Sequence, residues 1–286
     1  PPPPVKDVEP WGERMLLQPL LDTWVVDVAL DAVKAHSLGG DEVADLLVVS
    51  FSGHDRIGHQ LGPDSAKSAA DYRVIDAQIG RLLRALDAQV GKGRYVVALT
   101  SDHGVMPRPE LTRAQRLESG AVDPSVVLAA VKKEAEAALG PGTWFIGPKA
   151  QGLVAPAEVR AKVLGIAERL RKAARQVPGV RDLLPLPQVL AASESDPYRR
   201  GAYEGRSPDF IVVTQPYMMW GYGDATDHGS AYGYDRLVPL VFFGGALRQT
   251  RAGDARVIDL APTMAALLGV PSPAAARGQV LDAVAR

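Results

Sequence analysis

Three of the five histidines in this sequence lie close to an aspartate, each after a separate stretch that favours a β-strand. Asp55 and His59 are four positions apart, so a helical turn there would project both side chains from one side. Asp102 and His103 leave the next such stretch together, within TSDHG. His228 lies in the glycine-rich loop of DATDHGSAYGYD. Imidazole and carboxylate groups together suit Zn²⁺, and Mn²⁺ or iron is also open on these residue types.

Each of these residues taken alone also fits an ordinary structural role. An aspartate at a strand end is usually a helix cap or a turn former, and an isolated histidine usually has a hydrogen-bonding role. Their coincidence after three predicted strands favours a metal site. His36 fits the end of a helix, where a cation is favourable, and His54 is either a support for the neighbouring pair or an exposed residue. The sequence has no cysteine, so any transition-metal ion must be held by histidine and carboxylate side chains.

The composition argues against several other classes of protein. The net charge of −1 gives no sign of a surface for nucleic acid or for an anionic membrane. No apolar run approaches the roughly 20 residues that span a bilayer. Hydrophobic residues make up 47% of the chain, which is enough to bury a sizeable core.

Four short apolar stretches predict buried strands, at residues 44–51, 94–100, 209–214 and 238–243. Helical periodicity at residues 65–90 separates the first two, and a strand–helix–strand order is typical of a parallel sheet with right-handed crossovers. Ligands of such sheets bind beyond the carboxyl ends of the strands, where Asp55 and Asp102 lie. We therefore predict the α/β class, with a mainly parallel sheet flanked by helices.

The pattern changes in the middle of the chain, where two charged helical stretches surround a segment rich in glycine and proline. We interpret residues 110–205 as a smaller α+β insertion subdomain. Residues 11–109 and 206–286 would then form the α/β metal-binding core. The run of four prolines in residues 1–10 favours polyproline II, and we interpret it as a linker or a cut edge.

Four stretches together resemble the alkaline phosphatase superfamily: SFSGHDRIGHQLGPDS, ALTSDHGV, DHGSAYGYDRLVPLVFFG and VIDLAPTMAALLGVP. The similarity is greatest to the monomeric, phosphodiesterase-like alkaline phosphatase branch, which is related to the nucleotide pyrophosphatases. This resemblance implies an alkaline-phosphatase-like fold, a phosphate ester substrate and two Zn²⁺ ions in a complete site. By the same resemblance Asp55, His59 and His228 would hold one zinc ion. Asp102 and His103 would be part of the ligand set of the second.

The chain departs from that family in one respect. The family's nucleophilic threonine or serine, with a further aspartate ligand, lies on a segment before the equivalent of Trp11, and no stretch here matches it. The chain therefore resembles the C-terminal half of such an enzyme, and we expect the nucleophile upstream of residue 1. The implied partner is the N-terminal half of the same enzyme, as a separate chain or a missing segment. The resemblance also implies a periplasmic or secreted location.

Two interpretations of function are open at this point. The chain is either part of a phosphoric ester hydrolase or a non-catalytic metal-binding or interaction module on the same scaffold. Preference for monoesters, diesters or sulfate esters is equally open, because sulfatases share the superfamily.

Overall fold

The computed structural model describes residues 20–245, 247 and 253–285, which form two compact units. The first unit contains the described residues up to Gly104 and from Leu237 onward, and the second is Val105–Arg236. The predicted linker at residues 1–10 lies outside the described residues. Among the described helices, none combines the length and the apolar character needed to cross a membrane.

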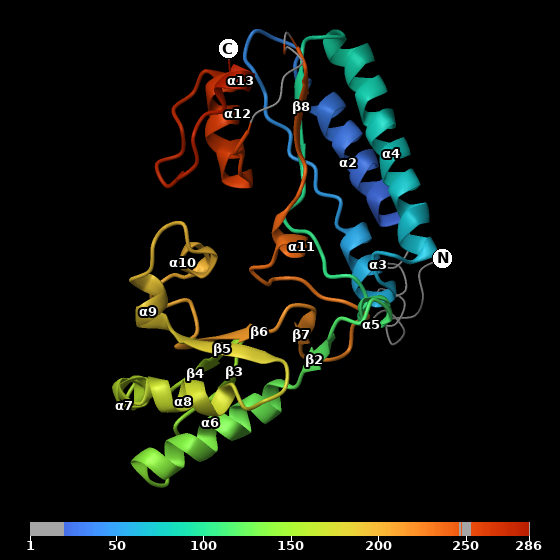
Figure 1. The fold of residues 1–286 in the computed structure, drawn as a ribbon. Helices are drawn as coiled ribbons and strands as arrows, with labels where there is room; N and C mark the ends of the chain where they lie inside the picture. The colour runs from blue at the N-terminus through green and yellow to red at the C-terminus, as the bar shows by residue number, and fades with distance from the viewer. Residues whose placement is uncertain (1–19, 246, 248–252, 286) are drawn as a thin grey trace, which may run out of the picture. The chain divides into compact units, whose positions relative to one another are not determined.

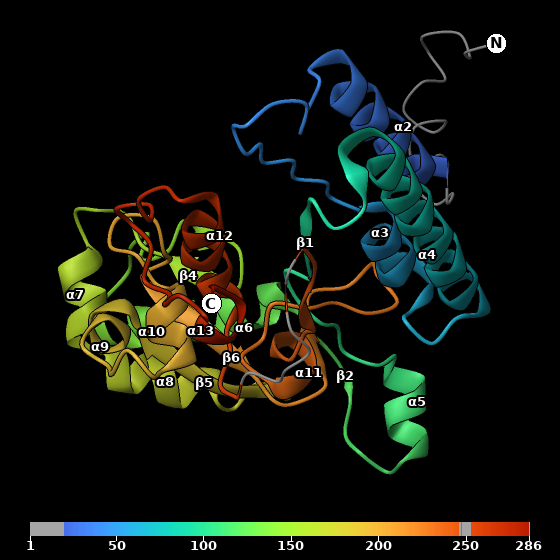
Figure 2. The same ribbon diagram turned by 90° about the horizontal axis from the view of Figure 1, so that it is seen from above.

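Three helices form one side of the first unit: α2 (Leu20–Ala35), α3 (Gly53–Leu61) and α4 (Ala66–Leu86). α2 and α4 lie side by side, with α3 against both (Figures 1 and 2). Val26 and Val33 share one buried face of α2. Ser65 begins α4, because its Oγ accepts the Ser68 backbone N–H at 3.1 Å. The helix predicted over residues 65–90 is confirmed by α4.

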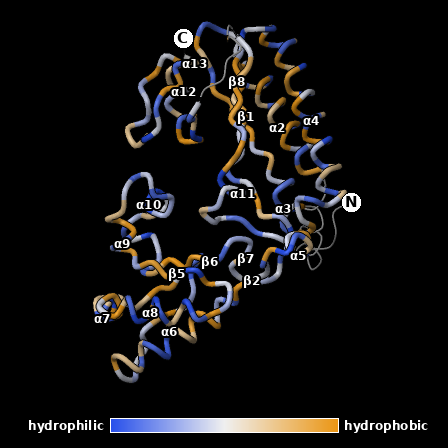
Figure 3. The backbone as a smooth tube through the Cα atoms, in the orientation of Figure 1, coloured by the Kyte–Doolittle hydropathy of each residue, from blue (hydrophilic) through white to orange (hydrophobic). Residues whose placement is uncertain are grey.

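The first unit also contains a two-stranded sheet of β1 (Val96–Thr100) and β8 (Leu240–Gly244). The strands pair antiparallel, with Val96 opposite Gly244 and Thr100 opposite Leu240. Both strands are largely hydrophobic (Figure 3). A short 3₁₀ turn, η3 (Val257–Asp259), leads into α12 (Leu260–Leu268), and α13 (Asp282–Ala285) follows further along the chain.

The second unit is built on a four-stranded antiparallel sheet in the order β3–β4–β6–β5. Its strands are β3 (Gly147–Pro148), β4 (Gly152–Val154), β5 (Val180–Pro185) and β6 (Phe210–Thr214). Side chains alternate between the two faces of a strand, so Leu183 and Val212 join the core with α6 (Pro124–Leu139) and α8 (Ala167–Ala174). Leu184 and Ile211 face the opposite way, toward α9 (Leu186–Leu190) and α10 (Pro197–Gly201). Figure 1 shows α6 and α8 below this sheet.

Smaller elements complete the second unit. β2 (Gly120–Val122) pairs parallel with β7 (Met218–Trp220), while α5 (Pro109–Ala114), α7 (Arg160–Gly165) and α11 (Gly233–Arg236) are short helices. The unit combines helices with an antiparallel sheet, and its bounds extend beyond residues 110–205 to include β6, β7 and the loop that follows them.

The pairing of the predicted strands differs from the single, mainly parallel sheet that we expected. Residues 94–100 and 238–243 do pair, but antiparallel, and residues 209–214 belong to the antiparallel sheet of the second unit. Residues 44–51 form no strand; Leu46 and Val48 are 57% and 80% exposed. An apolar, β-branched run predicts an extended backbone, but the partner and direction of a strand depend on contacts distant in sequence.

Asp182 on β5 joins the sheet to α8 through two arginines. Its carboxylate accepts two bonds of 2.6 Å from Arg171 and two of 3.1 and 2.9 Å from Arg175. Burial alone would raise the pKa of Asp182, but the two guanidinium groups hold it well below its usual range. The ionised carboxylate therefore stabilises the folded second unit.

Replacing Asp182 with Asn should lower the free energy of unfolding by about 2 to 3 kcal/mol at neutral pH. A carboxyl group with a depressed folded pKa contributes stability above its unfolded pKa and loses it as the pH falls. The difference between D182N and the parent should therefore shrink between about pH 5 and pH 2. Urea unfolding at several pH values measures both effects. Glu134→Gln is the control: its partner Arg169 is 53% exposed, and we expect a loss below about 1 kcal/mol. Equal losses for the two variants would contradict the special role of Asp182.

Candidate metal centre

Helix α3 presents Asp55 and His59 on one face. Asp55 is in its first turn and His59 in its last, and Asp55 Oδ1 lies 3.4 Å from His59 Nε2. The helical turn that we predicted after residue 51 is therefore present, with the i,i+4 geometry that brings both side chains together. Ile57 and Gly58 are buried on the same helix, which fixes its rotation.

His103 approaches the same carboxylate from the loop after β1, and Asp102 lies next to His103. His103 Nε2 lies 3.8 Å from Asp55 Oδ1 and 3.7 Å from Asp102 Oδ2. His103 Nδ1 lies 2.8 Å from the carbonyl oxygen of Gly104. A carbonyl can only accept, so in the neutral ring Nδ1 carries the proton and the lone pair of Nε2 is available to a metal ion. The first unit thus gathers two imidazoles and two carboxylates, four of the five predicted ligands.

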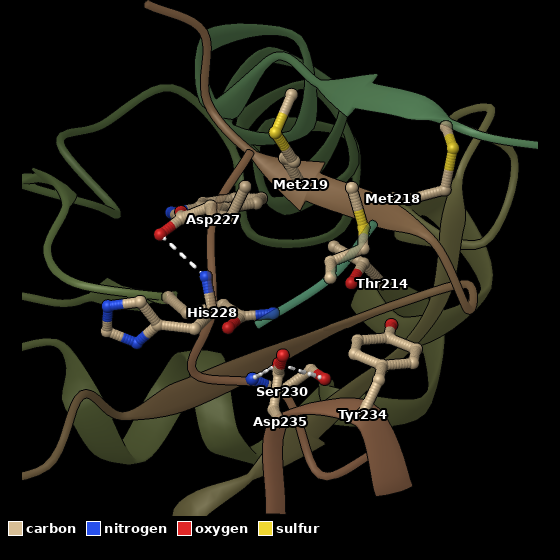
Figure 4. A pocket seen from close by; sticks show the side chains of 11 residues that line it. Thr214, Met218, Met219, Asp227, His228, Ser230, Tyr234 and Asp235 are labelled. Carbon is tan, nitrogen blue, oxygen red and sulfur yellow. Dashed lines mark hydrogen bonds between the residues drawn. The ribbon is translucent and has the colours of Figure 1, made fainter. Parts of the chain in front are cut away.

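His228 lies in a braced loop of the second unit (Figure 4). Its backbone N–H donates to Asp227 Oδ1 at 2.8 Å, so Asp227 has a turn-forming role. The buried Thr226 hydroxyl donates to the carbonyl oxygen of Met106. These bonds fix the backbone on the N-terminal side of His228.

Asp235 holds the far end of the same loop. Its Oδ2 accepts the backbone N–H of Ser230 at 2.8 Å and the hydroxyl of Ser230 at 2.5 Å, as Figure 4 shows. The side chain is buried, and burial raises the pKa of Asp235 despite these two hydrogen bonds. His228, Ser230 and Asp235 line one small cavity together with Tyr234. The loop is therefore supported from within its own unit.

Two buried aspartates that the sequence analysis missed hold the first turn of α3 from the neighbouring helices α2 and α4. Asp22 on α2 accepts the Gly53 backbone N–H at 3.1 Å, and Asp71 on α4 lies 3.0 Å from His54 Nδ1. Both aspartates are completely buried. Burial raises the pKa of Asp22, and the Gly53 hydrogen bond only partly offsets this.

Sequence reasoning could have found Asp22 from its position. It lies on the same helical stripe as Val26, Ala29 and Val33, which are all buried. An acidic residue on an apolar stripe is costly unless it is paired, so it signals a hydrogen-bonding role. His54, which we left between a supporting and an exposed role, has the supporting one.

Comparisons with known proteins identify relatives over most of the chain. A family model described as type I phosphodiesterase / nucleotide pyrophosphatase matches residues 2–235. The sequence is 25% identical over 293 residues to the alkaline phosphatase PafA of Elizabethkingia meningoseptica, covering 98% of this chain and 53% of that protein. A protein of Myroides odoratus named calcium-transporting ATPase is 27% identical over 268 residues, covering 88% of this chain and 48% of that protein.

The fold is similar to that of a solved protein as well. The crystal structure of wild-type PafA matches 95% of this chain and 54% of its own, with a TM-score of 0.85 at 23% identity. This similarity confirms the alkaline-phosphatase-like α/β fold class that we expected. The chain spans about half the length of the curated relatives that it matches.

Gly53 and Gly58 on α3 provide a matched test of the support behind the ligands. A Cβ on Gly53 would lie 2.7 Å from Asp22 Oδ2, whereas one on Gly58 would meet no atom within 4 Å outside the helix backbone. Gly53→Ala should therefore destabilise the chain by about 1 to 3 kcal/mol, because the helix start must move off Asp22. Gly58→Ala should be neutral or stabilise by up to about 1 kcal/mol through helix propensity. Urea unfolding of both variants measures this, and a stable Gly53→Ala protein would contradict the packing of Gly53 on Asp22.

Proposed function

Because the chain belongs to the type I phosphodiesterase / nucleotide pyrophosphatase family, we propose that it is the metal-holding part of a phosphoric ester hydrolase. One observation carries this proposal: Asp55 Oδ1 lies within 3.8 Å of both His59 Nε2 and His103 Nε2. Two imidazoles around one carboxylate form a donor set suited to zinc, with no cysteine needed.

We infer the metal ligands from the family resemblance, and the donor atoms of the described residues support them. Asp55, His59 and His228 would hold one Zn²⁺, each offering one oxygen or nitrogen atom. Three protein ligands with an open position is the usual composition of a catalytic zinc site. Asp102 and His103 would belong to a second zinc site, for which they supply one carboxylate and one imidazole. Bound zinc would supply Lewis acidity toward the phosphoryl oxygens.

The residues of this chain act by orienting those donors. The Gly104 carbonyl fixes the ring of His103, and Asp227 fixes the backbone at His228. Asp22 and Asp71 fix the first turn of α3 and so the direction of Asp55. Donors held in this way lose little freedom when they bind, which raises metal affinity.

The nucleophile would come from outside the sequence printed here. Three hydroxyls next to the candidate ligands in sequence already donate to backbone carbonyls: Thr100 to Pro239, Ser101 to His103 and Thr226 to Met106. We infer that the N-terminal half of the enzyme, as a separate chain or a preceding segment, supplies the attacking threonine or serine.

The relatives support one class of substrate. One relative is named an alkaline phosphatase and the family model is described as a phosphodiesterase, and both names describe hydrolysis of phosphate esters. A phosphate ester is therefore the substrate that we propose for the complete enzyme.

Metal titration tests the proposed ligands. The chain should bind Zn²⁺ tightly, and His228→Ala should weaken binding of the tighter ion by more than about 100-fold, because it removes one of three ligands. His36→Ala is the matched control: His36 is exposed after the end of α2, and its loss should leave affinity unchanged. Isothermal titration calorimetry measures all three proteins. Equal zinc affinity in His228→Ala and the parent would overturn the ligand assignment.

A phosphatase assay tests whether this chain holds the metal while the N-terminal half supplies the nucleophile. The chain alone with zinc should hydrolyse an aryl phosphate no faster than buffer, because positioning and electrostatics need a nucleophile to act on. Adding the N-terminal half should produce turnover that His228→Ala lowers. No turnover in that mixture would indicate the non-catalytic module instead. Zinc-dependent turnover by the lone chain, abolished by changing one of its own serines or threonines, would show that the nucleophile lies within it.

A further inference from the structure

The second unit contains a cavity of about 410 Å³ to which nothing in the proposed reaction assigns a role. Its walls come from α10, the turn between β3 and β4, the start of β6, and the loop after His228. A volume of this size is in the range of small-molecule sites. No aspartate or glutamate lines it, but two arginines do, Arg200 and Arg236.

These two arginines differ from others in the same unit. Arg171, Arg175 and Arg199 each pair with a carboxylate. Arg200 Nε instead donates to the backbone carbonyl of Glu194 at 2.6 Å, and Arg236 Nη1 donates to the carbonyl of Ala231 at 3.3 Å. Each guanidinium has five N–H groups, so both retain donors for an anion. Both side chains are exposed and available to a ligand.

The neutral groups of the cavity add donors and an apolar surface. Burial raises the pKa of Tyr198 to about 12, so its hydroxyl stays protonated and can donate. Ser207 Oγ accepts the backbone N–H of Tyr203 at 2.9 Å, which leaves its own proton to be donated. Pro197, Pro208 and Ile211 form an apolar part of the lining.

We propose that this cavity binds a small organic anion, with a phosphate or carboxylate group paired to Arg200 and Arg236 and an apolar body on Pro197, Pro208 and Ile211. Guanidinium groups suit these two anions because their forked N–H donors match two oxygens at once. Ser230 lines both this cavity and the smaller one that holds His228. A bound anion would therefore contact the loop that carries a proposed zinc ligand.

Calorimetry on the metal-free chain in EDTA tests the site without any contribution from bound zinc. Phenyl phosphate is the probe, with inorganic phosphate and phenol as its two halves. Phenyl phosphate should bind, inorganic phosphate should bind at least about tenfold more weakly, and phenol should give no measurable heat. Added KCl should weaken the binding of phenyl phosphate, because the pairing is ionic.

Two variants assign the binding to the arginines. Arg200→Gln and Arg236→Gln should each weaken phenyl phosphate binding at least about tenfold. Arg200→Lys, which keeps the charge, should lose less than Arg200→Gln. Arg169→Gln is the control, since it removes one positive charge of the same unit from an exposed pair on α8. Circular dichroism checks that each variant is folded.

The proposal is overturned if phenyl phosphate does not bind the parent, or if Arg169→Gln weakens it as much as Arg200→Gln. Because zinc is absent throughout, this result is independent of the metal titration above. A failed anion site would leave the proposed hydrolase untouched, and a failed zinc site would leave the anion site in place.

Discussion

The first turn of α3 is held by two buried carboxylates, and the direction of the candidate ligands depends on it. Asp22 accepts the backbone N–H of Gly53, and Asp71 pairs with the ring of His54. Neighbouring residues of a helix point in directions fixed by its geometry, so a fixed His54 also fixes Asp55. His59 follows one turn later on the same face. The packing of α2 and α4 against α3 therefore determines the orientation of the Asp55 and His59 side chains.

This support costs stability. One oxygen of Asp22 and one of Asp71 have no hydrogen-bond partner among the described residues, and burial raises the pKa of Asp22. A buried acceptor left unsatisfied costs about 1 to 3 kcal/mol. An apolar residue in place of Asp22 or Asp71 would remove that cost, but it would also remove the carboxylate that holds the first turn of α3. Such a local cost is typical of positions that serve a site rather than the core.

The sequence predicted side-chain arrangements that depend on neighbouring residues. It did not predict contacts between segments that lie far apart in the chain. The spacing of Asp55 and His59 requires only a helical turn, which depends on nearby residues, and the structure has it. Residues 44–51 carry the composition of a strand but find no strand partner, because pairing depends on segments far away in the chain. The partners of Asp22 and Asp71 could not be predicted for the same reason. The apolar stripe of α2 marks Asp22 as a polar residue in need of a partner, but that partner is supplied only when α3 packs against α2 and α4. His54 is next to Asp55 in the sequence, but its partner Asp71 lies 17 residues further along the chain and could not be identified from the sequence.

The loop around His228 follows the same design as α3. Its backbone is fixed by the Thr226 hydroxyl and by Asp235, and these partners lie in the same unit as the loop. Each unit can therefore orient its own donors through its own hydrogen bonds, without relying on an ion to arrange them. Preformed donors bind with a smaller loss of conformational entropy than donors ordered on binding. The cavity at Arg200 and Arg236 is lined in part by this same loop, so an anion there would add a further constraint on the backbone next to His228.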